Sequence, residues 1–448
     1  MNIQIAGAGR VGFHLARLLC AGGQDVTVID RNPQRREVVD FELDARTAVG
    51  DATSVLLLQS LGVDESDLFI ACTGNDNVNL IAANAAKGLG AKQAVARVDN
   101  PEYIESRFLY EGFLGVDHLL SPDALTAHDI INYIENPGVL ASEEFCRGKV
   151  QLRQLLAEAG RPADGRTVGE VFEAGSGVLA GVIGRAGDSI IPRGNTLIKA
   201  GDKVTLLGTK EKIAGAQRLF ADSPEVKRVA IFGAGTIGKL IARALDNRSQ
   251  TVKLFDKNAE RCEDAARDFF HVKVVNRDTS SRVSLEQEHL GEYDVFVATT
   301  EDDERNIMAG VLAREVGVKH VAAVVHQPDF APLVVKLGID VAITPRSSFA
   351  NSIQKIVHQN RVTASAFLGE GDVEVFELTL DEKSPVAGRQ LKDIGGGVFD
   401  AALVANILRG NEVIVPSGYD TFQPGDGVVV VATTKNAESV RRFLQGRK

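Results

Sequence analysis

A glycine-rich motif occurs twice in the sequence, and its two copies lie nearly half the chain length apart. The first copy is GAGRVG at 7–12 and the second is GAGTIG at 233–238, in a chain of 448 residues. An aspartate, Asp30 or Asp256, follows the first glycine of each copy by 23 residues and ends an apolar run. One such motif is weak support for a nucleotide site, whereas two in the same context are strong support. The chain is therefore predicted to be a tandem duplication of one dinucleotide-binding unit.

The glycines of the first motif have different roles in a strand–turn–helix unit. Gly7 permits the tight turn, Gly9 lets the backbone approach a pyrophosphate, and Gly12 lets the helix pack close to the strand. The free N–H groups at the start of the helix favour a phosphate there. Asp30 is placed to accept hydrogen bonds from ribose hydroxyls and to repel a 2′-phosphate. NAD is therefore favoured over NADP, although the basic residue after each aspartate weakens that preference.

Apolar runs and helical segments alternate through both copies. Strands with their adjoining loops are expected at 3–6, 26–29, 47–53, 67–73, 93–98 and 115–120, and again at 228–232, 251–255, 272–279, 294–300, 322–326 and 338–345. Six strands with intervening helices are typical of the doubly wound parallel-sheet α/β fold, or Rossmann fold. Ligands of this fold bind at the carboxyl ends of the strands, where Asp51, Thr73 and Arg97 fall. The second copy has no arginine in the run ending at His326, so the two sites are not expected to bind a ligand identically.

A smaller β-rich segment follows each large domain and contains a glycine–aspartate turn before a strand, at 201–202 or 425–426. These segments are predicted to be small α+β domains, each following one Rossmann domain. The predicted boundaries are 1–138 for the first nucleotide-binding domain, 139–222 for the first small domain, 226–362 for the second nucleotide-binding domain and 363–448 for the second small domain.

Two amphipathic helices are expected between the large and small domains, at 123–136 and 347–360. Each has an apolar stripe. This pattern is equally consistent with a helix that packs on its own domain and with a crossover or dimerisation helix.

Composition and residue spacing exclude several functions. A net charge of −10 argues against nucleic acid and anionic membrane surfaces as direct partners. No apolar run is long enough for a transmembrane helix, and the chain enters a strand directly after Met1 without a signal peptide, so a cytoplasmic location is expected. The four cysteines form no CxxC pair, and Cys20 and Cys72 are expected to be core thiols. The eight histidines form no HxxxH or HExxH spacing, so no metal site is expected.

The glycine motif, the aspartate after the second strand, the GDAT and RDT segments at 50–53 and 277–279 and the small glycine–aspartate domain together resemble the RCK family, whose large part is also called KTN. The resemblance spans the whole chain, and the order large–small–large–small is its most specific feature. It implies large domains that bind NAD or NADH, with ATP or ADP as alternative ligands at one of the two sites, and ligand-sensing small domains. It further implies a homo-oligomer, a dimer or a tetramer, that docks on the inner face of a membrane-embedded potassium transporter.

The resemblance also assigns residues to two cofactor sites. Those of the first site, with Asp51 added from its place at a strand end, are Gly7, Ala8, Gly9, Arg10, Val11, Asp30, Asp51, Thr73, Gly74 and Arg97. Those of the second site are Gly233, Ala234, Gly235, Thr236, Ile237, Asp256, Thr299 and Thr300. Arg97 would pair with a phosphate of the ligand.

The main alternative is an NAD-dependent oxidoreductase with duplicated Rossmann domains. That activity needs a proton-transfer group beside the nicotinamide and a substrate domain. The sequence shows no Tyr-xxx-Lys or His-Asp arrangement, and each small domain lacks the size for a substrate site of its own. We therefore predict a regulatory subunit without catalytic residues, in which nucleotides shift the arrangement of the domains and so gate a membrane partner. A binding module for another channel of the same broad type is a third possibility.

Overall fold

The computed structural model describes residues 1–136, 139–146, 148–173, 176–185, 188–221, 226–246, 250–278, 281–359, 364–368, 372–394 and 402–446. The chain divides into two compact units, one made of 1–134 with 226–357 and the other of 135–225 with 358–448. The first unit contains both glycine motifs, and the second contains both β-rich segments. No helix in the described ranges combines the length and apolar character that a membrane crossing requires.

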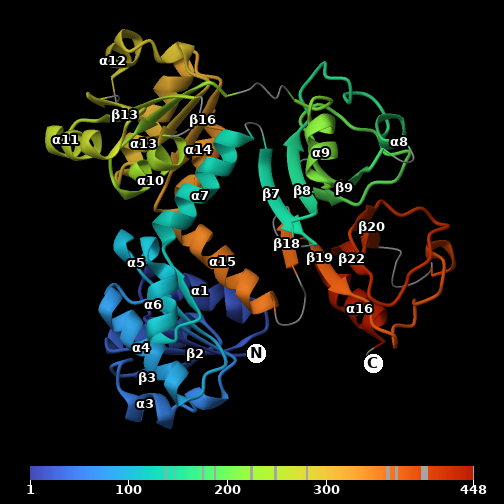
Figure 1. Cartoon of the computed structure of the whole chain (residues 1–448), viewed down its shortest axis with the longest axis horizontal. Coiled ribbons are helices and arrows are strands. Elements are labelled where there is room, and N and C mark those ends of the chain that lie inside the picture. The colour runs from blue at the N-terminus through green and yellow to red at the C-terminus, as the bar shows by residue number, and fades with distance from the viewer. Residues whose placement is uncertain are drawn as a thin grey trace. The chain divides into compact units, whose positions relative to one another are not determined.

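The first nucleotide-binding domain is built on a six-stranded parallel sheet with the order β3-β2-β1-β4-β5-β6 (Figure 1). Its strands are β1 (Asn2–Ala6), β2 (Asp25–Asp30), β3 (Arg46–Val49), β4 (Leu68–Ala71), β5 (Ala94–Arg97) and β6 (His118–Leu120). Its helices are α1 (Arg10–Ala21), α2 (Pro33–Glu42), α3 (Val55–Ser60), η1 (Val63–Glu65), α4 (Asp76–Leu89), α5 (Pro101–Glu105) and α6 (Arg107–Leu114). The strand order reverses between β1 and β4, which opens a crevice at their carboxyl ends.

The second nucleotide-binding domain repeats this topology with the order β14-β13-β12-β15-β16-β17, again all parallel. Its strands are β12 (Arg228–Phe232), β13 (Thr251–Asp256), β14 (Lys273–Asn276), β15 (Val295–Ala298), β16 (His320–Val324) and β17 (Val341–Ile343). Its helices are α10 (Thr236–Leu245), α11 (Ala259–Asp268), α12 (Arg282–Gln287), η2 (Leu290–Glu292), α13 (Asp303–Glu315), η3 (Pro328–Phe330) and α14 (Ala331–Lys336). The predicted pair of doubly wound Rossmann domains is thus confirmed.

Equivalent side chains cap the same helices in both domains. Asn32 starts α2 by accepting a hydrogen bond from a backbone N–H, and Asn258 does the same for α11. Asn75 caps α4 through the N–H of Val78, and Asp302 caps α13 through the N–H of Arg305. Short polar side chains that satisfy the free N–H groups of a first turn are favoured at such positions. These caps also align the two copies residue by residue.

Helix α7 (Pro122–Glu135) packs on the second nucleotide-binding domain although it follows the last strand of the first. Its Ala127, Ile130 and Ile134 belong to the core cluster of the second domain and are almost fully buried. The hydroxyl of Tyr133 donates a hydrogen bond to Asp340 Oδ2 across 2.9 Å. Figure 1 shows α7 in teal beside β16 and α14.

Helix α15 (Pro345–Gln359) makes the reciprocal exchange and packs on the first nucleotide-binding domain. Phe349 and Ile353 are fully buried in a cluster that includes Ile3 and Ile5 of β1. The two helices also touch, because Ser348 Oγ donates to Asp129 Oδ2 at 2.6 Å. Of the two interpretations left open by the sequence, the crossover helix is therefore the one observed.

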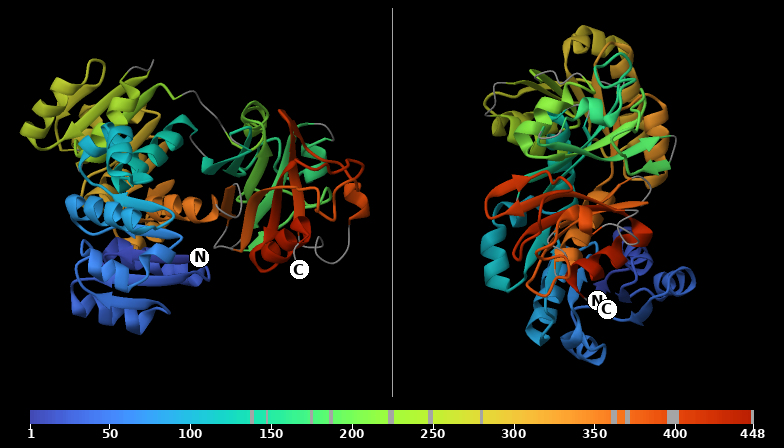
Figure 2. Two further views of the ribbon diagram at one scale, coloured as in Figure 1. Left: turned by 60° about the horizontal axis from the view of Figure 1, so that its bottom comes forward. Right: turned by 90° about the vertical axis from the view of Figure 1, so that its right-hand side faces the viewer.

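The two small domains each contain a five-stranded antiparallel sheet, with the orders β10-β9-β11-β8-β7 and β18-β19-β22-β20-β21. The elements of the first are β7 (Val139–Phe145), β8 (Val150–Leu156), α8 (Val168–Val171), β9 (Val178–Arg185), β10 (Asp188–Ile190), β11 (Lys203–Gly208) and α9 (Lys210–Gln217). Those of the second are β18 (Ala364–Leu368), β19 (Val373–Thr379), η4 (Leu391–Asp393), β20 (Ala402–Arg409), β21 (Glu412–Ile414), β22 (Gly427–Thr433) and α16 (Thr434–Gln445). One apolar cluster joins the two sheets, and Figure 2 shows their strands facing each other.

The glycine–aspartate turn has the same structure in both small domains. Asp202 and Asp426 are buried, and each accepts two hydrogen bonds from an arginine, Arg185 or Arg409. The turns therefore anchor the sheets rather than form an exposed binding loop. The predicted boundaries of the four domains remain predictions.

Candidate nucleotide-binding site

A cavity of about 600 Å³ lies at the carboxyl ends of β1, β2, β4 and β5, where the strand order reverses. This volume is within the range of pockets that hold small ligands. The residues that line it are Gly7, Gly9, Arg10, Val11, Ile29, Asp30, Arg31, Arg35, Gly50, Asp51, Ala52, Cys72, Thr73, Gly74, Asn75, Val78, Arg97, Pro122, Asp123, His326, Pro345 and Arg346. All the residues predicted for the first site line this cavity except Ala8.

The glycine loop packs closely against the backbone around it, as the motif predicts. Gly7 has a φ of 109°, and a Cβ placed there would lie 3.0 Å from the backbone nitrogen of Thr73. A Cβ on Gly12 would lie 1.8 Å from the carbonyl oxygen of Gly7. No side chain fits at either position, and the backbone of the loop is therefore free to face a ligand.

Asp30 holds the loop as well as facing the cavity. Its Oδ2 accepts a hydrogen bond from Ala8 N at 2.7 Å, and its Oδ1 accepts one from Asn32 N at 2.8 Å. Arg35 Nη1 lies 3.7 Å from Oδ2. Ala8 therefore contributes its N–H to the orientation of Asp30 and does not line the cavity. Each carboxylate oxygen has a second lone pair, which is available to a ribose hydroxyl.

A buried amide that the sequence did not single out for the site fixes the other rim of the cavity. Asn79 accepts hydrogen bonds from the N–H and the hydroxyl of Thr73, at 2.8 and 2.7 Å. Its own NH₂ donates to the carbonyl of Arg97 at 2.9 Å. Asn79 therefore connects the ends of β4 and β5 through hydrogen bonds. In the sequence, only the equivalent asparagine of the second copy, Asn306, indicates that this residue is important.

Arg97 lies in the cavity, with a carboxylate as its partner. Its guanidinium contacts Asp99 at 2.8 Å, and its side chain is 19% exposed. The predicted pairing of Arg97 with a ligand phosphate remains a prediction.

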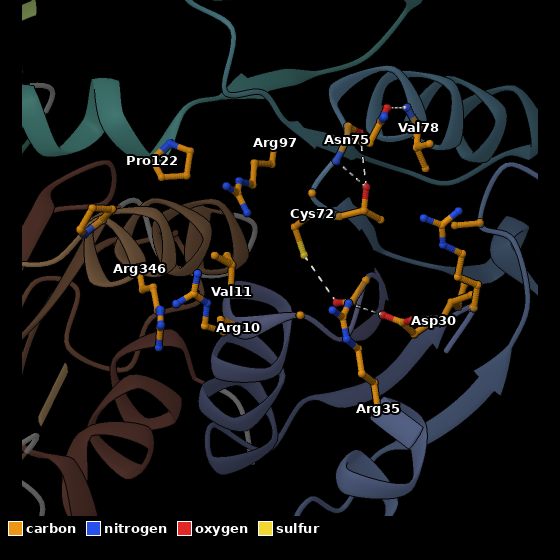
Figure 3. Close-up of a pocket in the computed structure, with 18 of the residues that line it drawn as sticks. Arg10, Val11, Asp30, Arg35, Cys72, Asn75, Val78, Arg97, Pro122 and Arg346 are labelled. Atoms are coloured by element: carbon orange, nitrogen blue, oxygen red, sulfur yellow. Dashed lines mark hydrogen bonds and ion pairs between the residues drawn. The ribbon is translucent and has the colours of Figure 1, made fainter. Parts of the chain in front are cut away.

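Two polar lining residues come from the second nucleotide-binding domain, together with Pro345, and were not predicted. Arg346, from the first turn of α15, lies beside Arg10 of α1 in the cavity (Figure 3). Burial lowers the pKa of Arg346, and the positive charge of Arg10 lowers it further. The other residue is His326, whose Nδ1 lies 2.8 Å from Asp303 Oδ1. No spacing in the sequence relates either residue to the first glycine motif.

The charges in the cavity favour an anion. Five arginines line it against three aspartates, although the whole chain has a net charge of −10. Hydrogen bonds from the backbone and side chain of Thr53 lower the pKa of Asp51. Burial raises the pKa of Asp123, and the nearby charge of Asp99 raises it further. A cluster of guanidinium groups of this kind suits a ligand with several phosphate oxygens.

The cavity contains no activated thiol. Burial raises the pKa of Cys72 to about 12, so this thiol stays neutral, as expected of a core cysteine. Within the described ranges, no three His, Cys, Asp or Glu side chains are arranged to hold a metal ion.

The second domain repeats the backbone geometry of the first. Gly233 has a φ of 109°, and Asp256 accepts hydrogen bonds from Ala234 N and Asn258 N, both at 2.8 Å. Gly235 is the N-cap of α10, and Thr236 and Ile237 are its first residues. A hollow of about 420 Å³ beside this loop is lined by Ala234, Gly235 and Thr236, together with Glu105 of the first domain and other residues.

The polar rim of the second domain also follows the first. Thr300 donates its N–H and hydroxyl to Asn306, whose NH₂ donates to the carbonyl of Val324. Thr299 Oγ1 lies 3.1 Å from the carbonyl oxygen of Gly233. Val324 therefore stands where the first domain has Arg97, in agreement with the expected difference between the two sites.

Comparisons with known proteins agree with this repeated architecture. The TrkA-N domain family matches residues 3–122 and 229–345, and the TrkA-C domain family matches residues 152–221 and 375–445. The Trk system potassium uptake protein TrkA homolog of Archaeoglobus fulgidus is 34% identical, over 99% of this chain and 100% of its own length. The Trk system potassium uptake protein TrkA of Halomonas elongata is 32% identical over 99% of both chains.

Solved structures show the same fold at lower identity. The crystal structure of the GsuK RCK domain matches with a TM-score of 0.62 at 19% identity, covering 100% of this chain and 95% of that one. The GsuK channel bound to NAD matches with a TM-score of 0.62 at 20% identity, covering 100% and 79%. The family models and the full-length relatives confirm the resemblance on which the sequence interpretation was based. Its two TrkA-N and two TrkA-C domains, and its full-length similarity to these relatives, show that the chain belongs to the TrkA family of Trk system potassium uptake proteins.

Proposed function

We propose that this chain is a nucleotide-binding regulatory subunit of a potassium uptake transporter and that its first site binds NAD or NADH. The observation that carries the proposal is the cavity between the glycine loop, Asp30 and the arginine cluster. The loop and the start of α1 suit a pyrophosphate, and Asp30 suits the adenosine ribose. The names of the relatives support a role in potassium uptake, and the NAD-bound GsuK channel supports the choice of ligand.

Regulation follows from the fact that both nucleotide-binding domains line the cavity. A ligand that contacts Arg10 and Arg346 together favours the arrangement in which these two side chains lie close. Its binding energy therefore shifts an equilibrium between domain arrangements, by as much as its affinity differs between them. A membrane-embedded transporter, on which the chain docks at the inner face of the cell membrane, would receive this shift, with the chain acting as a homo-oligomer. ATP or ADP would compete for the same site through their shared adenosine and phosphates.

Replacing Asp30 with alanine tests the first-site assignment. We expect NAD affinity to fall about thirtyfold, because the ribose loses a charged acceptor worth about 2 kcal/mol. Titration calorimetry with NAD, NADH, ATP and ADP would give the affinity and the stoichiometry per chain. Rubidium uptake by cells that carry the transporter would show whether nucleotide control is lost.

Asp256→Ala is the matched control, since Asp256 makes the same backbone contacts in the second domain. We expect this variant to keep its affinity at the first site. Normal NADH binding by Asp30→Ala would mean that the first site is wrongly assigned, and turnover of NADH with a substrate would point to an enzyme.

Arg346→Gln tests the contribution of the second domain to the first site. We expect nucleotide affinity to fall about tenfold and to depend less steeply on salt, because one cation near the phosphates is lost. Arg267→Gln is the control, since Arg267 is exposed and pairs only weakly with Asp264 at 3.4 Å. An unchanged affinity and salt dependence for Arg346→Gln would remove this side chain from the site.

Asp123 gives the site a predictable pH dependence. Its raised pKa rises further when an anion binds beside it, so binding takes up a proton. Affinity is therefore highest at acidic pH and falls as pH rises and Asp123 ionises. For Asp123→Asn, we expect a flatter profile above the ordinary aspartate range of about pH 4, and an affinity about threefold higher at the alkaline end. Calorimetry as a function of pH would check both, and an identical profile in the variant would contradict the prediction.

A further inference from the structure

An ion pair spans the crevice of the second nucleotide-binding domain. Arg305 Nη2 on α13 lies 3.0 Å from Asp278 Oδ1, in the loop that follows β14. In the sheet, β13 and β12 lie between β14 and β15, the strand that precedes α13. The pair therefore crosses over the ends of β12 and β13, and the Arg305 guanidinium lies 5.6 Å from the ring centre of Phe232, the last residue of β12.

The first domain leaves the equivalent space open. Val78 corresponds to Arg305, because each lies three residues after the side chain that caps its helix. Both donate their backbone N–H to that capping side chain. Asp51 corresponds to Asp278, because the residue before each makes the same backbone hydrogen bond. Gly50 N donates to the carbonyl of Asp30, and Arg277 N donates to the carbonyl of Asp256. Val78 and Asp51 both line the cavity of the first domain, and the Asp51 carboxylate accepts hydrogen bonds from Thr53.

The phosphate end of the second site also differs in charge. Glu301 stands where the first domain has Gly74, since each follows the threonine that binds the buried asparagine. Thr236 stands in place of Arg10 at the start of the glycine-motif helix. With Val324 in place of Arg97, the phosphate end of the second site lacks two cations of the first site, and Glu301 adds a carboxylate there. A pyrophosphate loses charge-assisted hydrogen bonds there and meets a like charge.

We infer that Arg305 is a specificity-determining residue, which closes the second domain to the nucleotide that the first domain binds. In the Rossmann fold, the adenosine half of a dinucleotide lies over the strand ends that the Arg305–Asp278 pair crosses. The side chain of Arg305 is 22% exposed, and its guanidinium both pairs with Asp278 and lies over the ring of Phe232. An adenine ring must displace the guanidinium and leave Asp278 without this partner. The chain therefore binds one nucleotide, and the second Rossmann domain supplies Arg346 and His326 to the site of the first.

This inference rests on the proposed function, and the stoichiometry of NAD binding to the full chain tests it. Titration calorimetry of the wild-type chain should give one NAD per chain. The double variant Glu301→Gly/Arg305→Val places the residues of the first domain at these two positions, and we expect it to bind a second NAD. The reciprocal change, Val78→Arg, gives Asp51 a cationic partner and should weaken binding at the first site at least tenfold.

Arg282→Val is the matched control, because Arg282 is an exposed arginine of the same domain that pairs with Glu286 on its own helix. It should keep the wild-type stoichiometry and affinity. Two NAD per wild-type chain, or full affinity in Val78→Arg, would overturn the inference while leaving the proposed function in place. No NAD binding by the wild-type chain would overturn both.

If the double variant folds poorly, binding at the two sites can be distinguished in a chain that also carries Asp30→Ala. In Asp30→Ala, the first site is weakened, so any strong NAD binding comes from the second domain. We expect no strong binding in Asp30→Ala and a recovered site in Asp30→Ala/Glu301→Gly/Arg305→Val. A strong site in Asp30→Ala alone that Asp256→Ala then removes would show that the second domain is open, against the inference.

Discussion

Replacing Gly12 with alanine is expected to abolish NAD binding and to lower the free energy of unfolding by about 3 kcal/mol or more. The new Cβ would lie 1.8 Å from the carbonyl oxygen of Gly7. That oxygen has little room to withdraw, because Gly7 itself lies close to the backbone of Thr73. The helix must therefore move away from the strand, and the N–H groups at its start move away from the phosphate position.

Two glycine variants make this prediction specific. Gly88 lies in α4, and a methyl group added there would have no heavy atom within 4 Å, so Gly88→Ala should be neutral or slightly stabilising. Gly238→Ala repeats the clash of Gly12 at 1.8 Å in the second domain and should destabilise the fold to a similar extent. Urea unfolding and titration calorimetry would measure both effects. Wild-type affinity in a folded Gly12→Ala variant would show that the loop does not hold the ligand.

Phe349→Ala is expected to lower the free energy of unfolding by about 3–5 kcal/mol, because it removes a fully buried aromatic ring. Although Phe349 belongs to α15, its ring packs in the core of the first nucleotide-binding domain. Arg346 lies one turn earlier on the same helix. We therefore also expect weaker NAD binding at the first site, which an ordinary core substitution far from the cavity would not cause.

Phe41→Ala is the control, since the Phe41 side chain is 90% exposed and its loss should change stability by less than about 0.5 kcal/mol. Chemical denaturation would give the stability of both variants, and calorimetry their NAD affinity. If Phe349→Ala unfolded like the wild-type chain, the exchange of helices between the two domains would be wrong.

The sequence predicted the parts of the fold that depend on local chemistry. The glycine motifs, the aspartates that end β2 and β13 and the alternation of strands and helices all follow from short-range patterns, and the structure confirms them. The partner of each crossover helix was not predictable, because an apolar stripe shows which face is buried and not which domain covers it. Ala8 stays a predicted site residue: its side chain does not line the cavity, and its N–H donates to Asp30, a contact that the motif alone does not show.

The part of the candidate site that the sequence missed comes from far along the chain. Arg346 and His326 reach the first cavity only because two domains meet, and no periodicity or spacing encodes such a meeting. The difference between the two sites was visible at Arg97, whose counterpart is apolar. The role of Arg305 was not, because its position follows an ordinary helix cap and its partner Asp278 lies in another loop.

The exchanged helices give the duplication a further significance. Pro122 and Pro345 begin these helices, so Asp123 and Arg346 occupy matching positions, and both line the one cavity. If two separate copies of a single half assembled in this way, both positions would carry the same residue, since both would be translated from one codon. Joining the halves in one polypeptide removes that constraint. A carboxylate and a guanidinium can then line one cavity where a symmetric pair would have placed two like charges, and each half can specialise without the other.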